Sequence, residues 1–183
     1  MATLKLNSYE LFSQSSNNRP VYGSGVPTGT IVQQVIKNEM IGDGTAANAH
    51  EYVPTSNTGT FTSVFWNLSI TTTLTNSKIQ LFAQSPYVYI QSGTGGEFWF
   101  TRNPSSDNID VNRSGAGSGY VVYTADSGGA FRQMNAYDTP NVVAGTVLNY
   151  VVKYRRWYGS AEVYWVYDRG GSFGIFTITE IAA

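Results

Sequence analysis

Alternation of apolar and polar residues within 60–72, "TFTSVFWNLSITT", is the feature that most limits what this chain can fold into. The residues on one side of this stretch are apolar, namely Val64, Trp66, Leu68 and Ile70. Because side chains alternate across a β-strand, the pattern predicts a strand with one buried face. Residues 77–84, "SKIQLFAQ", repeat the pattern with Ile79, Leu81 and Ala83 predicted to point inward.

Similar segments continue to the C-terminus, and turn residues separate them at intervals of about 8–12 residues, the spacing typical of an all-β sandwich or barrel. No segment has the period of a helix of three turns. We therefore predict a jelly-roll-like antiparallel β-sandwich over residues 31–183. Residues 1–30 contain "FSQSSNNRPVYGSGVPTG", a polar stretch interrupted by Gly and Pro. This segment is predicted to be an extended N-terminal arm and linker.

Composition excludes several classes of function. Of 183 residues only 13% are charged, and the net charge is −1, which gives no global attraction for nucleic acid. The absence of cysteine excludes disulfides and thiolate metal sites. No run approaches the roughly 20 apolar residues of a membrane span, and "MATLKLNSYELF" has no apolar signal region. We expect a protein made in a cytoplasm, with no nucleic-acid partner and no membrane insertion.

The stretch "YRRWYGSAEVYWVY" at 154–167 is rich in aromatic residues and raises the question of a binding surface. Alternation predicts a core-facing side of the preceding strand, made of Leu148, Tyr150, Val152 and Tyr154. The triplet 158–160 is typical of a hairpin turn, with a return strand after it. Four residues at the predicted tip are candidates for a recognition or subunit-contact surface: Arg155, Arg156, Trp157 and Tyr158.

Motifs for catalysis are weak. The single histidine, His50, lies in a predicted loop, and no nucleophile elbow or phosphate-binding motif occurs. The segment 107–115 contains Asp107, and from Asp110 it resembles the first half of a calcium loop, but Val121 occupies the place of the bidentate Glu. A polar hairpin loop is the alternative. We expect no enzyme activity, no cofactor and no resident metal.

Motifs in order along residues 29–183 resemble a family of short virion proteins of marine bacteriophages, especially cyanophages, which are described as tail-fibre-like or head-appendage proteins. The motifs are "GTIVQQV", "SITTTLTNSKIQLFAQ", "FWFTRN", "YDTPNVVAGTVLNYVVKYR" and "FTITEIAA". The segment 107–133 departs from the family's small-residue-rich centre, so these loops are this protein's own.

This resemblance implies a structural, non-enzymatic role in a phage virion and a homotrimeric assembly. The expected partners are other virion proteins, bound through the arm, and a glycan of the host surface. Two alternatives remain open. One is a capsid decoration or cement protein that stabilises the shell, and the other is a glycan-active enzyme whose two acids converge only in the folded chain.

Overall fold

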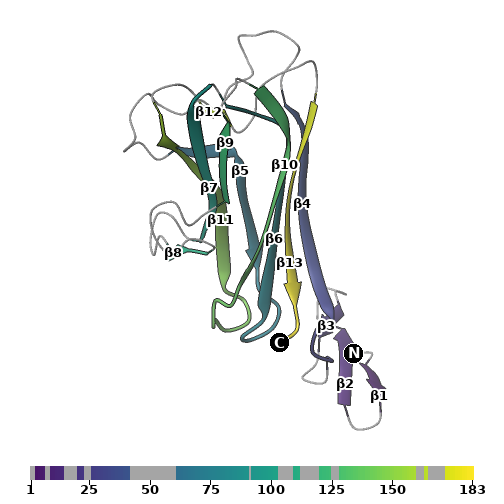
Figure 1. The fold of residues 1–183 in the computed structure, drawn as a ribbon. Helices are drawn as coiled ribbons and strands as arrows, with labels where there is room; N and C mark the ends of the chain where they lie inside the picture. The colour runs from purple at the N-terminus through teal and green to yellow at the C-terminus, as the bar shows by residue number, and fades with distance from the viewer. Residues whose placement is uncertain are drawn as a thin grey trace.

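The computed structural model describes residues 3–6, 9–14, 20–22, 26–41, 61–90, 92–102, 109–111, 120–124, 128–159, 163–164 and 172–183. These residues form strands, turns and bends, with no helix among them. Two antiparallel sheets face each other as a sandwich, and a third, small sheet lies beside one end of it (Figure 1). The all-β sandwich predicted from the alternation is confirmed.

The first sheet, named here the β4 sheet, has the order β10-β6-β13-β4, and β12 also pairs with β6. Its strands are β4 (Ile31–Ile41), β6 (Lys78–Ile90), β10 (Gly128–Asp138), β12 (Val163–Tyr164) and β13 (Ser172–Ile181). The second, the β5 sheet, has the order β5-β11-β7-β8, and β9 also pairs with β7. Its strands are β5 (Phe61–Thr71), β7 (Thr94–Arg102), β8 (Ile109–Asp110), β9 (Tyr120–Thr124) and β11 (Val147–Tyr158).

The pairing of the eight longer strands of the sandwich is that of a jelly roll. The first pairs with the last (β4 with β13), the second with the seventh (β5 with β11), the third with the sixth (β6 with β10), and the fourth with the fifth (β7 with β9). Rolling one long hairpin produces this nested order, with two Greek keys. The jelly-roll prediction is therefore confirmed.

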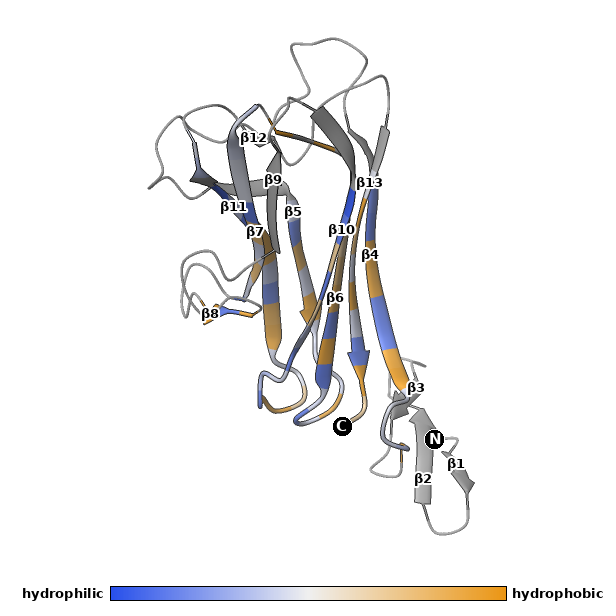
Figure 2. Ribbon diagram, viewed as in Figure 1, coloured by the Kyte–Doolittle hydropathy of each residue, from blue (hydrophilic) through white to orange (hydrophobic). Residues whose placement is uncertain are grey.

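The core lies between the two sheets and follows the predicted alternation. Trp66, Ile79, Leu81 and Ala83 are fully buried, Ile70 is almost so, and Leu68 packs against them. The inward residues of β11 are also buried as predicted, namely Leu148, Tyr150, Val152 and Tyr154. Figure 2 shows the same pattern as alternating orange and blue along β4 and β6. The side chain of Val64 lies outside the described residues.

The N-terminal segment contains three strands that the sequence did not predict. These are β1 (Thr3–Leu6), β2 (Tyr9–Gln14) and β3 (Pro20–Tyr22), which form their own antiparallel sheet. The chain joins the sandwich just before β4, where the Gly29 N–H donates to the carbonyl of Ala182 and the Ala182 N–H donates to the carbonyl of Thr30, at 2.8 and 2.9 Å. Residues 29–30 are thus tied to the C-terminal end of the sandwich.

Candidate functional surface

The segment 154–158 is not the tip of a hairpin, contrary to the sequence prediction. Strand β11 continues to Tyr158 and pairs with β7 there, with Arg156 opposite Gly96 and Tyr158 opposite Gly95. The expected return strand is represented by β12, which pairs with β6 in the opposite sheet. Directly after β11, Gly159 adopts a φ of +84°, and a Cβ at this position would collide with the Gly93 carbonyl oxygen and with Thr94.

Arg155 is held by an acid that is distant in sequence. Its Nε lies 2.5 Å from Oε2 of Glu97, which is directly opposite on β7 and fully buried. Opposite charges that face each other across two strands stabilise the pairing.

Arg156 is buried, with only 4% of its surface exposed, so the expectation of an exposed guanidinium is wrong at this residue. Its position continues the inward series of Tyr154, and the facing residue, Gly96, has no side chain to fill that space. Tyr158 is 55% exposed, as expected for a surface residue. The side chain of Trp157 lies outside the described residues, and the recognition or subunit-contact role of the four residues stays a prediction.

The outward side of β7 is buried and polar. Trp99 Nε1 and Thr101 Oγ1 both donate hydrogen bonds of 2.9 Å to Oδ1 of Asp110 on the neighbouring β8. Asp110 is the first candidate calcium ligand, and this oxygen already accepts two donors. His50, Asp107 and 112–115 lie outside the described residues, and the described part of the chain holds no group of three acids or histidines that could bind a metal.

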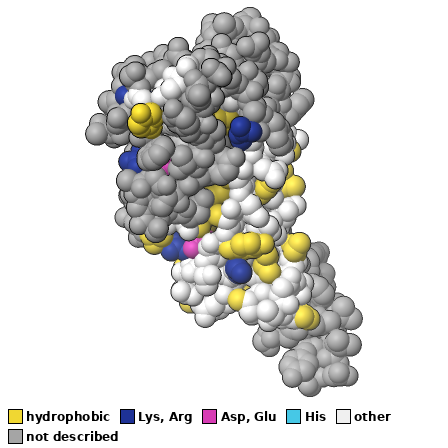
Figure 3. Space-filling view, viewed as in Figure 1, with side chains coloured by type: hydrophobic (Ala, Val, Ile, Leu, Met, Phe, Trp, Pro, Cys, Tyr) yellow, Lys and Arg dark blue, Asp and Glu magenta, His cyan; other side chains and the backbone are white. Residues whose placement is uncertain are grey.

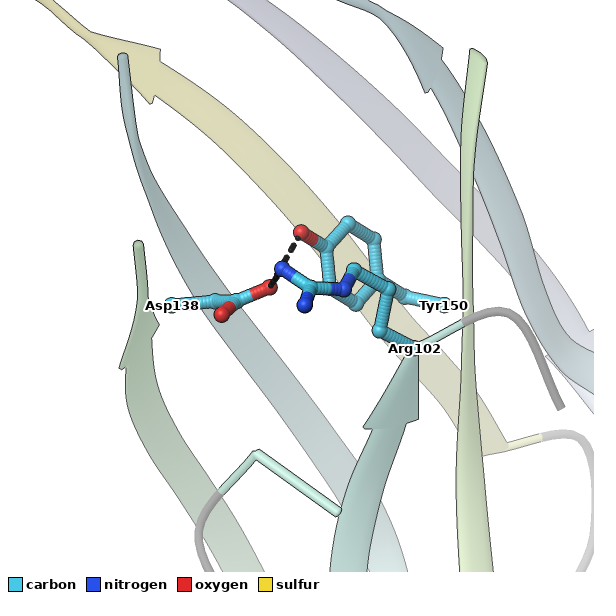
Figure 4. A network of polar contacts seen from close by, with 3 residues as sticks. All are labelled: Arg102, Asp138 and Tyr150. Carbon is cyan, nitrogen blue, oxygen red and sulfur yellow. Dashed lines mark hydrogen bonds and ion pairs between the residues drawn. The ribbon is translucent and has the colours of Figure 1, made fainter. Parts of the chain in front are cut away.

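A second polar cluster joins the two sheets. Arg102 at the end of β7 and Asp138 at the end of β10 form an ion pair, with 2.8 Å between Nη1 and Oδ2 (Figure 4). The Tyr150 hydroxyl on β11 donates to the same carboxylate oxygen, also at 2.8 Å. Burial, and then the adjacent Asp138 charge, raise the pKa of Tyr150 well above its usual value. The phenol is therefore a neutral donor that helps to hold Asp138.

Glu180 forms a third cluster at the end of β13, and it is fully buried. Its carboxylate accepts hydrogen bonds from the backbone N–H groups of Thr73 and Leu74, from the Thr73 hydroxyl and from Gln33 Nε2, at 2.6–3.0 Å. Burial alone would raise the pKa of Glu180, but the bonds from Leu74, Gln33 and Thr73 outweigh it and hold the pKa below its usual value. The carboxylate thus links β13 by hydrogen bonds to β4 and to the turn after β5.

Sequence reasoning missed these clusters, although a signal for them exists. The second and third clusters have charged residues at positions whose parity belongs to the core: Arg102 follows Phe98 and Phe100, Asp138 follows Met134 and Ala136, and Glu180 follows Phe176 and Ile178. A charge in such a position requires a buried partner. In these clusters the carboxylates accept hydrogen bonds from neighbouring strands or turns. The chemical role of the arrangement is to hold the ends of the strands together.

No protein-family model and no curated protein sequence matches this chain. Among solved structures it is similar to the CBM22-1 xylan-binding domain from Paenibacillus barcinonensis Xyn10C, with 12% identity over 87% of this chain and 99% of that domain and a TM-score of 0.32. It is also similar to a chain of the infectious bursal disease virus Gt strain, with 11% identity over 96% of this chain and 52% of that chain, and a TM-score of 0.30.

A VP2 subviral particle of infectious bursal disease virus gives 10% identity over 83% of this chain and 42% of that chain, with a TM-score of 0.27. The chain thus spans about half or less of the viral chains. We draw no function from these likenesses. No helix in the described part of the chain is long and apolar enough to cross a membrane.

Proposed function

We propose that this protein is a non-enzymatic structural component of a bacteriophage virion, a homotrimeric surface appendage of tail-fibre or head-fibre type. In this proposal it is made in the host cytoplasm and joins the particle through residues 1–30. The proposal rests first on the ordered sequence motifs that resemble marine phage virion proteins.

The supporting structural observation is where those motifs meet. Gln33 of "GTIVQQV", Leu74 of "SITTTLTNSKIQLFAQ" and Glu180 of "FTITEIAA" come together in one hydrogen-bonded cluster. Arg102 of "FWFTRN" joins Asp138 and Tyr150 of the fourth motif in another (Figure 4). Motifs that are far apart in the sequence thus supply residues that hydrogen-bond to one another in the folded protein. The resemblance therefore covers residues that hold the sandwich together at one end.

The N-terminal segment joins the sandwich at this same end, where the turns after β5 and β10 lie. The turn after β5 bonds to the turn after β10, through Asn76 N–H to the Val142 carbonyl at 2.8 Å and Gly145 N–H to the Thr72 carbonyl at 2.7 Å. Residues 29–30 bond to the C-terminal residues on the same side (Figure 1). An end whose turns are hydrogen-bonded to one another, next to the N-terminal segment, suits attachment to a particle, with the opposite end directed outward.

The test is deletion of residues 1–28 in phage that carry the gene, with particle incorporation measured by immunoblot of purified virions. We expect the truncated protein to fold with nearly unchanged thermal unfolding and to be missing from particles. A truncated protein that still enters particles overturns the attachment role. Light scattering of the intact protein tests the trimer, and a stable monomer at micromolar concentration contradicts it.

Antibody labelling of intact particles separates the appendage from a decoration protein. Label on tails or on isolated head fibres agrees with the appendage, whereas label spread evenly over the capsid shell favours the cement alternative. Hydrolysis of a polysaccharide by the pure protein, lost on substitution of a single acid, would contradict the non-enzymatic proposal.

A further inference from the structure

The outward face of the β4 sheet presents three straight rows of side chains across four strands. In the order β4, β13, β6, β10, the rows are Gln34, Thr179, Gln80 and Tyr137; Ile36, Thr177, Phe82 and Asn135; and Asn38, Ile175, Gln84 and Gln133. We name these twelve residues the amide face. With strands about 4.8 Å apart and alternate residues about 7 Å apart, it covers about 14 Å in each direction.

The amide face carries no charged side chain. Where Figure 3 shows the described surface over β10 and β4, white predominates, which marks backbone and uncharged polar side chains, with yellow side chains and a few dark blue ones among it. Lys78 lies at its margin, with its ammonium 4.5 Å from the centre of the Tyr137 ring. The outward face of the other sheet differs, since Lys153 and the Arg155–Glu97 pair lie on it. The solvated side of a sheet ordinarily carries charges among its polar residues, whereas these three adjacent rows carry none, and Lys78 lies one row beyond them on the same side of β6.

Several groups of the amide face are held in place before any ligand arrives. Gln34 Nε2 donates to the Thr179 hydroxyl at 2.9 Å, and Gln80 Nε2 donates to Asn135 Oδ1 at 3.4 Å. Thr177 and Thr179 are 9% and 3% exposed because their neighbours cover them. The amides of Asn38 and Gln133 are exposed, that of Gln84 is half-buried, and Tyr137 is 51% exposed. Ordered amides lose less conformational entropy on binding than free ones.

The chemistry of this face matches an uncharged polyhydroxylated ligand. Each amide offers both donors and an acceptor, as a sugar hydroxyl does, and an uncharged surface has no ion to desolvate when it is covered. Tyr137 and Phe82 add aromatic surface on which the C–H face of a sugar ring can pack. An anionic ligand would need a positive charge, and none of these twelve residues carries one.

We propose that the amide face binds a neutral polysaccharide laid across the strands, as a glycan of the host surface would be in the proposed virion role. This inference rests on the proposed function only for the source of the glycan. The binding chemistry belongs to the face itself, so binding can be measured on the purified chain without any particle.

The probes are four soluble neutral polysaccharides (a β-glucan, a mannan, a xylan and a dextran) and one anionic polysaccharide, alginate. Affinity electrophoresis of the full chain should show retardation by at least one neutral polymer and none by alginate. The triple variant Gln84→Ala, Gln133→Ala, Asn135→Ala should weaken that binding by about tenfold or more, since each lost amide removes hydrogen bonds to the ligand. Tyr137→Ala should weaken it by a similar factor.

The matched control is Asn67→Ala with Asn149→Ala, which removes amides from the outward face of the other sheet and should leave binding unchanged. Unfolding curves of every variant establish that it is folded. No retardation by any neutral polymer, equal binding by the triple variant, or preference for alginate would each overturn the inference. If the triple variant instead has a lower oligomeric mass than the wild-type protein, the face is a contact with a second copy of the chain. Particle incorporation is read separately: a chain that enters virions but binds no glycan contradicts only this inference.

Discussion

The carboxylate of Glu180 accepts a 3.0 Å hydrogen bond from the backbone N–H of Leu74, which precedes it by 106 residues. Glu180 is on the last strand and Leu74 is in the turn between β5 and β6, so this bond connects the last strand of the sandwich to the turn after its second long strand. The pair shows that a fully buried acid in this protein stabilises a turn, and it gives the first prediction.

Glu180→Gln should destabilise the protein by about 2–4 kcal/mol, because an amide loses the charge-assisted bonds and turns a donor toward backbone N–H groups. Guanidinium unfolding measures the effect. Gln133→Ala, at an exposed site, is the control and should stay within about 0.5 kcal/mol of wild type. Equal stability of both variants would mean that the bonds to the turn contribute nothing net.

The same residue predicts a pH dependence. Because the folded state holds the pKa of Glu180 below its unfolded value, the unfolded chain binds more protons in acid, so stability rises with pH in that range. This stabilisation is present above the unfolded pKa of about 4.3 and is lost as the pH falls through the folded pKa. Denaturant midpoints from pH 7 to pH 3 should therefore decline less steeply for Glu180→Gln than for wild type. Parallel curves for the two proteins would contradict the assignment.

The Arg102, Asp138 and Tyr150 cluster should respond unequally to its substitutions. Asp138→Asn leaves Arg102 without its paired charge in a place that is only 11% exposed, and we expect a loss of about 2–4 kcal/mol. Tyr150→Phe removes one hydrogen bond and should cost about 1 kcal/mol. A double-mutant cycle by urea unfolding should show coupling between the two sites. Additive effects would mean that the hydroxyl does not help to hold Asp138.

Alanine substitutions of Arg156 and Tyr158 should differ in their cost to stability, because Arg156 is buried and Tyr158 is exposed on the same strand. Arg156→Ala is expected to destabilise by about 2 kcal/mol or more, since it empties a site that is 4% exposed. Tyr158→Ala should cost less than about 1 kcal/mol, because more than half of this side chain already faces solvent. Thermal and denaturant unfolding compare them. If oligomer mass or adsorption to cells falls with Tyr158→Ala alone, the surface role predicted for this residue is supported, and unchanged values would argue against it.

Gly159→Ala should be costly for a steric reason. A Cβ here would lie 2.4 Å from the carbonyl oxygen of Gly93, in addition to the strain of a φ of +84°. We expect a loss of about 3 kcal/mol or more. Gly145→Ala is matched in φ, at +87°, but has no atom within 4 Å of its Cβ, and should show only the backbone cost of about 1–2 kcal/mol. Equal losses would show that β7 can move to accept a Cβ at 159.

The alternation of residues by itself determined which side of each strand enters the core, because that property depends only on the period of an extended chain. Trp66, Leu81 and Tyr150 were assigned correctly on this basis. The class of fold followed from many short strands without a helical period. The strands between Thr3 and Tyr22 were not predicted, because strands of 3 to 6 residues are too short for a period of two to be recognised in them.

Only the tertiary structure decided where β11 ends and what its arginines contact. The strand reaches Tyr158 because β7 runs beside it, and Arg156 is buried because Gly96 leaves room opposite it. Arg155 found Glu97, which is 58 residues away, and the amides of β4, β6 and β10 became one surface only when three distant strands came into register. Such pairings depend on the relative positions of strands far apart in the chain, and a local period carries no information about them.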